Sequence, residues 1–101
     1  MQRADHAWDR YRFLERNAAI PEPPSFYIRR QVCATFQDDR VGIVTRDIVG
    51  AGNLMWASDY PHSDSTWPNS REVIARDFAG IPEADRRKIT ADNAAQLYGV
   101  G

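Results

Sequence analysis

Two short apolar runs restrict the fold of this chain more than any other feature of its sequence. They are QVCATF at 31–36 and LMWAS at 54–58, and each ends at polar residues. Runs of this length that are rich in apolar, β-branched and aromatic residues predict buried strands. More than a dozen residues separate them, and strands this far apart along a chain pair in parallel through a right-handed crossover. The expected fold is therefore α/β.

Helical patterns surround the two runs. Before the first run, an amphipathic helix is expected from Asp5, as its N-cap, to about Asn17. The prolines that follow predict an extended connector at 20–25. The apolar residues that recur along this helix at spacings of three and four are Trp8, Tyr11, Leu14 and Ala18.

The segment between the runs, DRVGIVTRDIVGAG, predicts a helix that Asp38 or Asp39 caps and that Gly50 or Gly52 ends. Its expected buried face consists of Val41, Val44 and Ile48.

Three further helices are expected after the second run. The first begins at the capping pair Asn69 and Glu72 and ends at Gly80. The second has Pro82 in its first turn, and the third, DNAAQLYG, ends at Gly99. The face that the first of them is expected to bury consists of Val73, Ile74 and Phe78.

Two parallel strands do not make a stable sheet by themselves. Both runs are apolar on both faces, which is typical of a sheet that helices cover on both sides. Two strands leave open edges and too little surface to bury both faces. We therefore expect either a piece of a larger α/β protein or a chain that completes its sheet with a partner.

The composition excludes several classes of protein. Hydrophobic residues make up 43% of the chain and charged residues 27%, which is typical of a soluble globular protein. The net charge of −1, with both signs interspersed, predicts no nucleic-acid partner and no membrane partner. No apolar run approaches the roughly 20 residues of a membrane span, and the N-terminus is too charged for a secretory signal. The expected location is the cytoplasm.

Cys33 is the single cysteine of the chain, so no internal disulfide can form. This fits a reducing compartment. Its place in the middle of the first run predicts a small core residue.

Asp59 is the strongest candidate for a functional residue. In parallel α/β proteins, functional residues gather at the carboxyl ends of strands, and Asp59 follows the second run directly. Side chains alternate along a strand, so Asp59 should share a face with Met55 and Ala57. A carboxylate beside an apolar strand is costly unless it meets a cation, a metal or several hydrogen-bond donors.

Four motifs occur in order along the second half of the chain: SDYPH at 58–62, WP at 67–68, NAA at 93–95 and LYG at 97–99. FYIRRQV and TFQDD flank or overlap the first run. Together they resemble the C-terminal end of the amidohydrolase-related family, the metal-dependent (β/α)8-barrel group that includes aminocarboxymuconate-semialdehyde decarboxylase. The resemblance implies that residues 1–101 form one partial domain, about the last two βα units of a TIM barrel with its terminal helices.

The resemblance also implies a chemistry. Asp59 matches the aspartate at the end of the family's eighth strand, which binds a divalent metal, typically zinc, and accepts the proton of the attacking water. The activity implied is that of a hydrolase or a decarboxylase, a carbon–carbon lyase, acting on a small-molecule carboxylate or amide. His62 is a weaker candidate for substrate binding.

The chain lacks most of the family's metal ligands. The family also uses a His-x-His pair on its first strand and histidines on its fifth and sixth, whereas this chain has only His6 and His62. A zinc site needs about three protein ligands, and a full barrel takes about 250 residues. We therefore expect a C-terminal segment of a longer enzyme that is inactive by itself.

Other interpretations stay open at this stage. Asp59 could simply cap the following loop, and His62 and Asp64 could be turn residues. The chain could instead be a non-catalytic, truncated barrel module that acts through protein association. Exposed strand edges favour association in either case, so a homo-oligomer is a further expectation.

Overall fold

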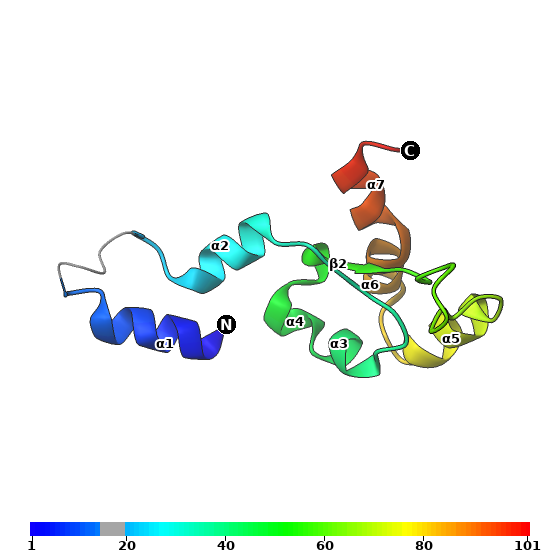
Figure 1. Cartoon of the computed structure of the whole chain (residues 1–101), viewed down its shortest axis with the longest axis horizontal. Helices are drawn as coiled ribbons and strands as arrows, with labels where there is room; N and C mark the ends of the chain where they lie inside the picture. Colours follow the sequence, from blue (N-terminus) through cyan, green and yellow to red (C-terminus); the bar gives the residue numbers. More distant parts are fainter. Residues whose placement is uncertain (15–19) are drawn as a thin grey trace. The chain divides into compact units, whose positions relative to one another are not determined.

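The computed structural model describes residues 1–14 and 20–101. The chain divides into two compact units, Met1–Val32 and Cys33–Gly101 (Figure 1). The predicted end of the first helix near Asn17, and its apolar position Ala18, lie outside the described residues. No helix in the described ranges is long and apolar enough to cross a membrane.

The first unit contains helices α1 (Gln2–Tyr11) and α2 (Pro24–Gln31). Helix α1 begins three residues before the predicted N-cap, so the prediction that Asp5 caps it is wrong. The Asp5 carboxylate instead accepts a hydrogen bond of 2.8 Å from the backbone N–H of Ser25, in the first turn of α2. The first N–H groups of a helix lack partners within the helix, and the N-cap of α2, Pro23, offers no side-chain acceptor. Asp5 therefore caps the other helix.

The proline-rich connector is shorter than predicted. Pro23 is extended, with φ −61° and ψ 150°, but Pro24 is already the first residue of α2. Proline suits this position because its fixed φ is helical and its missing N–H would have no partner there. The same helix takes up Gln31, which was predicted to begin the first strand.

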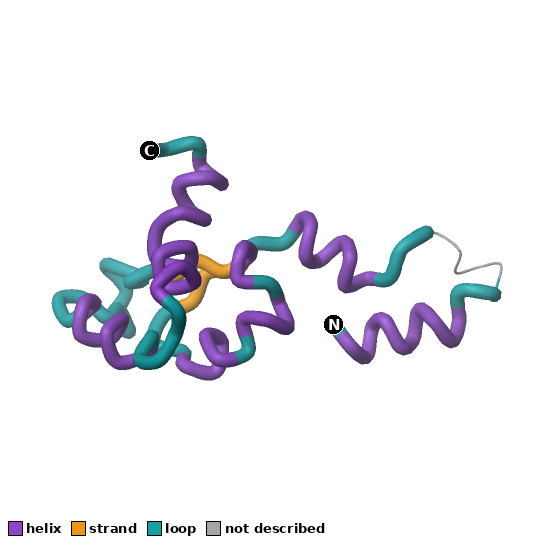
Figure 2. Tube along the Cα trace, turned by 180° about the vertical axis from the view of Figure 1, so that it is seen from behind, coloured by secondary structure: helices purple, strands orange, loops and turns teal. Residues whose placement is uncertain are grey.

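The second unit is built on two parallel strands, β1 (Ala34–Phe36) and β2 (Leu54–Trp56). They lie side by side among helices (Figure 2). The paired positions are Ala34 with Leu54, Thr35 with Met55 and Phe36 with Trp56. The predicted parallel pairing is confirmed, although each strand is shorter than its apolar run.

Only the second strand is buried as predicted. Leu54 and Met55 are each 5% exposed, whereas Ala34 and Thr35 of β1 are exposed. Cys33 precedes β1 and is also exposed, so the prediction that it is a core residue is wrong. The physical reason is that β1 pairs with one strand only, within the described part of the chain.

The crossover between the strands contains α3 (Arg40–Val44), α4 (Arg46–Val49) and the short 3-10 helix η2 (Ala51–Asn53). Asp39 caps α3 as predicted, accepting a hydrogen bond of 2.9 Å from the N–H of Gly42. Gly50 ends α4 with φ 109°, which favours glycine.

The predicted buried face of the crossover is wrong. Val41, Val44 and Ile48 are 69%, 49% and 52% exposed, whereas Ile43 is fully buried. The helix breaks at Thr45, between α3 and α4. A single helical period therefore does not continue from Val41 to Ile48.

Four helices follow β2: α5 (Ser70–Asp77), α6 (Glu83–Arg87), the π-helix η3 (Lys88–Asp92) and α7 (Asn93–Tyr98). Asn69 is the N-cap of α5, but its side chain makes no capping hydrogen bond, and Pro82 is the N-cap of α6 rather than a residue of its first turn. Gly99 ends α7 in the left-handed conformation, as predicted.

The core of the second unit joins the crossover, the sheet and the C-terminal helices. Helix η3 packs against β2. The buried apolar side chains that form the core cluster are Ile43, Leu54, Phe78 and Ile89.

Candidate functional site

Asp59 lies just beyond the carboxyl end of β2. Its backbone φ is 59°, in the left-handed region that non-glycine residues seldom adopt. Its side chain is 57% exposed and lines a cavity of about 220 Å³ together with Ala57, Thr35, Phe36 and Gln37. The cavity therefore receives residues from the ends of both strands, which is where we expected a site. That Ala57 and Asp59 line it together agrees with their predicted shared face.

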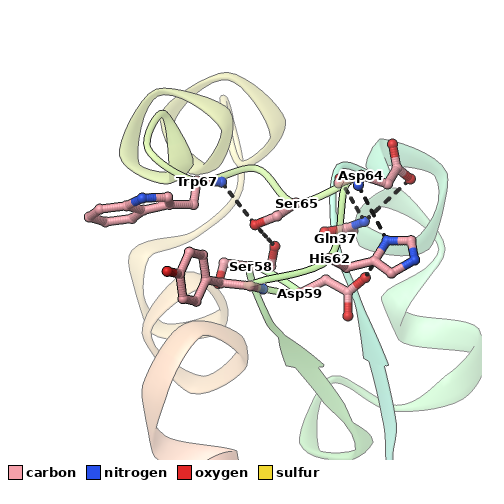
Figure 3. Close-up of polar contacts among 8 residues, drawn as sticks. Gln37, Ser58, Asp59, His62, Asp64, Ser65 and Trp67 are labelled. Carbon is pink, nitrogen blue, oxygen red and sulfur yellow. Dashed lines mark hydrogen bonds and ion pairs between the residues drawn. The ribbon is translucent and has the colours of Figure 1, made fainter.

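His62 lies beside Asp59 (Figure 3). Its Nδ1 is 3.5 Å from Oδ2 of Asp59 and accepts a hydrogen bond of 3.2 Å from the backbone N–H of Asp64. The backbone N–H of His62 in turn donates to the carbonyl of Asp59, at 2.8 Å. The turn therefore holds the imidazole next to the carboxylate, on the same side of the loop as Asp64.

Gln37 is a cavity residue that the sequence analysis missed. It follows β1 directly, and its Nε2 donates to the backbone carbonyl of Asp64 at 3.1 Å and approaches Oδ2 of Asp64 at 3.5 Å (Figure 3). This side chain links the end of β1 to the loop that follows β2. The signal that could have found it is the parallel pairing, because Gln37 is the first residue after Phe36, the partner of Trp56.

Ser58 and Ser65 fold the loop after β2 back on itself. The Ser65 hydroxyl donates to the carbonyl of Ser58 at 2.7 Å and accepts from the N–H of Trp67 at 3.1 Å. Trp67 packs edge-to-face on Tyr60, with ring centroids 6.0 Å apart, and it lies on the opposite side of the loop from His62 and Asp64 (Figure 3). Ser58 thus serves the loop through its carbonyl, and Trp67 belongs to the loop packing.

Asp38 and Asp39, the two carboxylates that follow β1, already have partners. Asp38 forms an ion pair with Arg76, which also binds Asp77 at 2.8 Å. The hydrogen bond to Asp77, with help from Asp38, raises the pKa of Arg76 above its ordinary value. Asp39 caps α3. Asp59, by contrast, lines the cavity.

A complete metal site is not formed by the described residues. No group of three or more histidine, cysteine, aspartate or glutamate side chains within them could hold a metal ion. Zinc sites need about three protein ligands, and Asp59 with His62 supplies two side chains. The residues described here therefore do not fit a self-sufficient metal centre.

Comparison with known proteins identifies the family. The family model described as Amidohydrolase matches residues 35–100, which is more than half of the chain and includes the cavity residues. The chain belongs to the amidohydrolase family. Members of the amidohydrolase superfamily are generally metal-dependent.

The fold of this amidohydrolase-family chain is similar to that of a solved decarboxylase. The crystal structure of 5-carboxyvanillate decarboxylase from Sphingomonas paucimobilis matches it with a TM-score of 0.80 and 23% sequence identity. The match covers 99% of this chain and 30% of the decarboxylase, so the chain spans less than a third of that protein's length. At this identity the likeness concerns the fold alone. A search of curated proteins gives no significant match.

Proposed function

We propose that this chain is the C-terminal part of a metal-dependent enzyme of the amidohydrolase superfamily, which hydrolyses or decarboxylates a small carboxylate or amide. In this proposal the two parallel strands are the last two of a (β/α)8 barrel. The observation that carries it is the position of Asp59, whose exposed carboxylate lines a cavity at the carboxyl ends of both strands. In barrels, catalytic groups project from that end.

Asp59 is proposed as a ligand of a divalent metal, with zinc as the expected ion, and as a proton acceptor. Its carboxylate is free of the ion pair and helix cap that engage Asp38 and Asp39. An exposed carboxylate beside a histidine can take a proton from a water or a substrate group within hydrogen-bond reach. The other metal ligands would come from outside the described residues, so we assign no reaction step to a metal held by this chain alone.

The cavity floor suits a small substrate. Ala57 leaves space below Asp59, and Thr35, Phe36 and Gln37 provide polar and apolar contacts on the β1 side. His62, 65% exposed and next to Asp59, is proposed as a substrate-binding residue at the mouth of the site. Its imidazole can donate a hydrogen bond to a carboxylate or carbonyl oxygen.

The test uses the natural protein that carries these residues, purified with its metal. Asp59→Asn keeps the shape of the side chain and removes its charge, and should lower both metal content and turnover, the latter by about 10²- to 10⁴-fold. Turnover is measured as carbon dioxide released from small aromatic carboxylates and as amine released from small amides. Asp47→Asn makes the same change on the exposed face of α4 and should leave both unchanged. Full activity in Asp59→Asn would exclude the assigned role.

The alternative is a non-catalytic module that acts by association. The exposed residues of β1 and the exposed Val41, Val44 and Ile48 favour it, because unpaired strands and apolar helix faces promote association. The intact mass of the natural gene product distinguishes the enzyme from the non-catalytic module. A species several times larger than 11.5 kDa supports the enzyme, whereas a stable oligomer of 11.5 kDa chains without stoichiometric metal supports the module.

A further inference from the structure

The side chain of Gln37 reaches from the end of β1 to the loop that carries Asp59 and His62. Its Nε2 faces two acceptors of Asp64, the backbone carbonyl at 3.1 Å and Oδ2 at 3.5 Å. Since both are acceptors only, the amide nitrogen rather than the amide oxygen must face Asp64. The orientation of the Gln37 amide is therefore fixed by its partner.

Asp64, which Gln37 holds, in turn contacts His62. The backbone N–H of Asp64 donates to Nδ1 of His62 at 3.2 Å, and a backbone N–H can act only as a donor. Oδ2 of Asp59 also lies 3.5 Å from Nδ1, but as an ion-pair neighbour and not as a hydrogen-bond acceptor. The hydrogen bond from Asp64 therefore decides the neutral tautomer, in which Nδ1 carries the lone pair and Nε2 the proton. Within the described residues no hydrogen bond is made by Nε2 of His62.

We propose that Gln37 is a positioning residue of the site: through Asp64 it holds neutral His62 in the tautomer that carries its proton on Nε2. That N–H is then left to donate to an oxygen of the substrate. That this N–H donates to a substrate rests on the function proposed above. The tautomer itself, and its dependence on Gln37, do not rest on that function.

The second polar atom of Gln37 makes the proposal testable. Oε1 is buried and has no hydrogen-bond partner among the described residues. Replacing Gln37 with methionine, which has a similar length, removes the bond to Asp64 and this unsatisfied acceptor together. The change removes an unpaired buried acceptor, and the Asp64 acceptors that lose their donor belong to an exposed residue, where water can replace it, so Gln37→Met should fold.

The experiment is a long-range proton–nitrogen NMR spectrum of the ¹⁵N-labelled full chain, at a pH where imidazoles are neutral. In the wild type, His62 should show one tautomer, with Nδ1 unprotonated and Nε2 protonated. In Gln37→Met the two nitrogen shifts of His62 should converge towards those of His6, an exposed histidine of α1. The shifts of His6 should not change.

Asp64→Ala is the matched control. It removes the side chain but keeps the backbone carbonyl that Gln37 binds and the N–H that His62 binds, so the tautomer should be retained. An averaged His62 spectrum in the wild type, or an unchanged one in Gln37→Met, would overturn the proposal. Because the spectrum needs neither metal nor substrate, that result would not contradict the role proposed for Asp59. Conversely, a protein that shows the single His62 tautomer but has no activity would contradict the proposed function and not the role of Gln37.

Discussion

The buried amide of Asn93, in α7, holds the first residue of β2 in place: its Nδ2 donates to the carbonyl of Leu54 at 2.7 Å and to that of Ala51, also at 2.7 Å. Asn93 is 8% exposed. One side chain thus fastens the last helix to η2 and to the strand that leads to Asp59. The position of the candidate site therefore depends on a residue much further along the chain.

We expect Asn93→Ala to destabilise the second unit by about 2 kcal/mol or more, because it leaves two carbonyls without their donor in a buried place. The measurement is urea unfolding of the full chain, followed by circular dichroism. Asn93→Asp should be at least as harmful, since it places a charge beside the two carbonyl oxygens. Gln96→Ala, on the exposed side of the same helix, is the control, and an equal loss in both helix variants would contradict the clamp.

The backbone of Asp59 predicts an unusual ranking of variants. At φ 59°, alanine is strained whereas glycine is not, so Asp59→Gly should be more stable than Asp59→Ala by about 1 kcal/mol. Asp59→Asn should lie near the wild type, because asparagine tolerates this region. The midpoints of chemical unfolding give the ranking. If Ala proved as stable as Gly, the left-handed conformation would be wrong.

The helices of the crossover predict a contrast between two neighbouring apolar residues. Ile43→Ala should destabilise the chain by about 2–5 kcal/mol, since it opens a cavity in the core beside Leu54 and Phe78. Val41→Ala, at a side chain that is 69% exposed, should change stability by no more than about 0.5 kcal/mol. Unfolding in urea measures both. If Val41→Ala were the more destabilising of the two changes, the buried face predicted from the sequence would be correct instead.

The contact between Asp5 and Ser25 predicts a pH dependence in the first unit. The hydrogen bond from the N–H of Ser25 lowers the pKa of the Asp5 carboxyl below its usual value. Because the folded-state pKa is the lower one, the contact stabilises this unit above the unfolded pKa. The stabilisation is lost as the pH falls through the folded pKa.

An NMR titration of the Asp5 side-chain carboxyl tests this directly. Ser25 amide exchange should speed up over the same acidic range, as the hydrogen bond is released. Asp5→Asn keeps an acceptor oxygen but does not titrate, so its Ser25 amide should show no such step. A carboxyl that titrates at the ordinary aspartate value would contradict the contact.

Local signals in the sequence predicted much of the second unit. The parallel pairing follows from two apolar runs and the length of chain between them, and the cap at Asp39 and the stops at Gly50 and Gly99 follow from residue types that suit those backbone positions. The location of Asp59 after a strand was likewise predicted from the apolar run that precedes it. The cap and the two stops rest on interactions within a few residues or on a steric preference of one residue, and the pairing rests on the length of the connection.

Contacts between distant residues were beyond the sequence. The period of DRVGIV fits several faces of a helix, and only packing against Leu54 and Phe78 selects Ile43 as the buried residue. An aspartate near a helix start suits a cap, but only the fold shows that Asp5 caps the helix that begins at Pro24.

The sequence by itself therefore determined the two strands, their parallel direction and the candidate residue that follows β2, but it predicted neither helix α2 nor the break between α3 and α4. The tertiary structure decided which side chains surround that residue: Gln37 from the other strand, and His62 and Asp64 from the folded loop. The physical reason is that a turn or a cap is stabilised by neighbours in the chain. A cavity, by contrast, exists only once segments that are far apart in sequence have packed together.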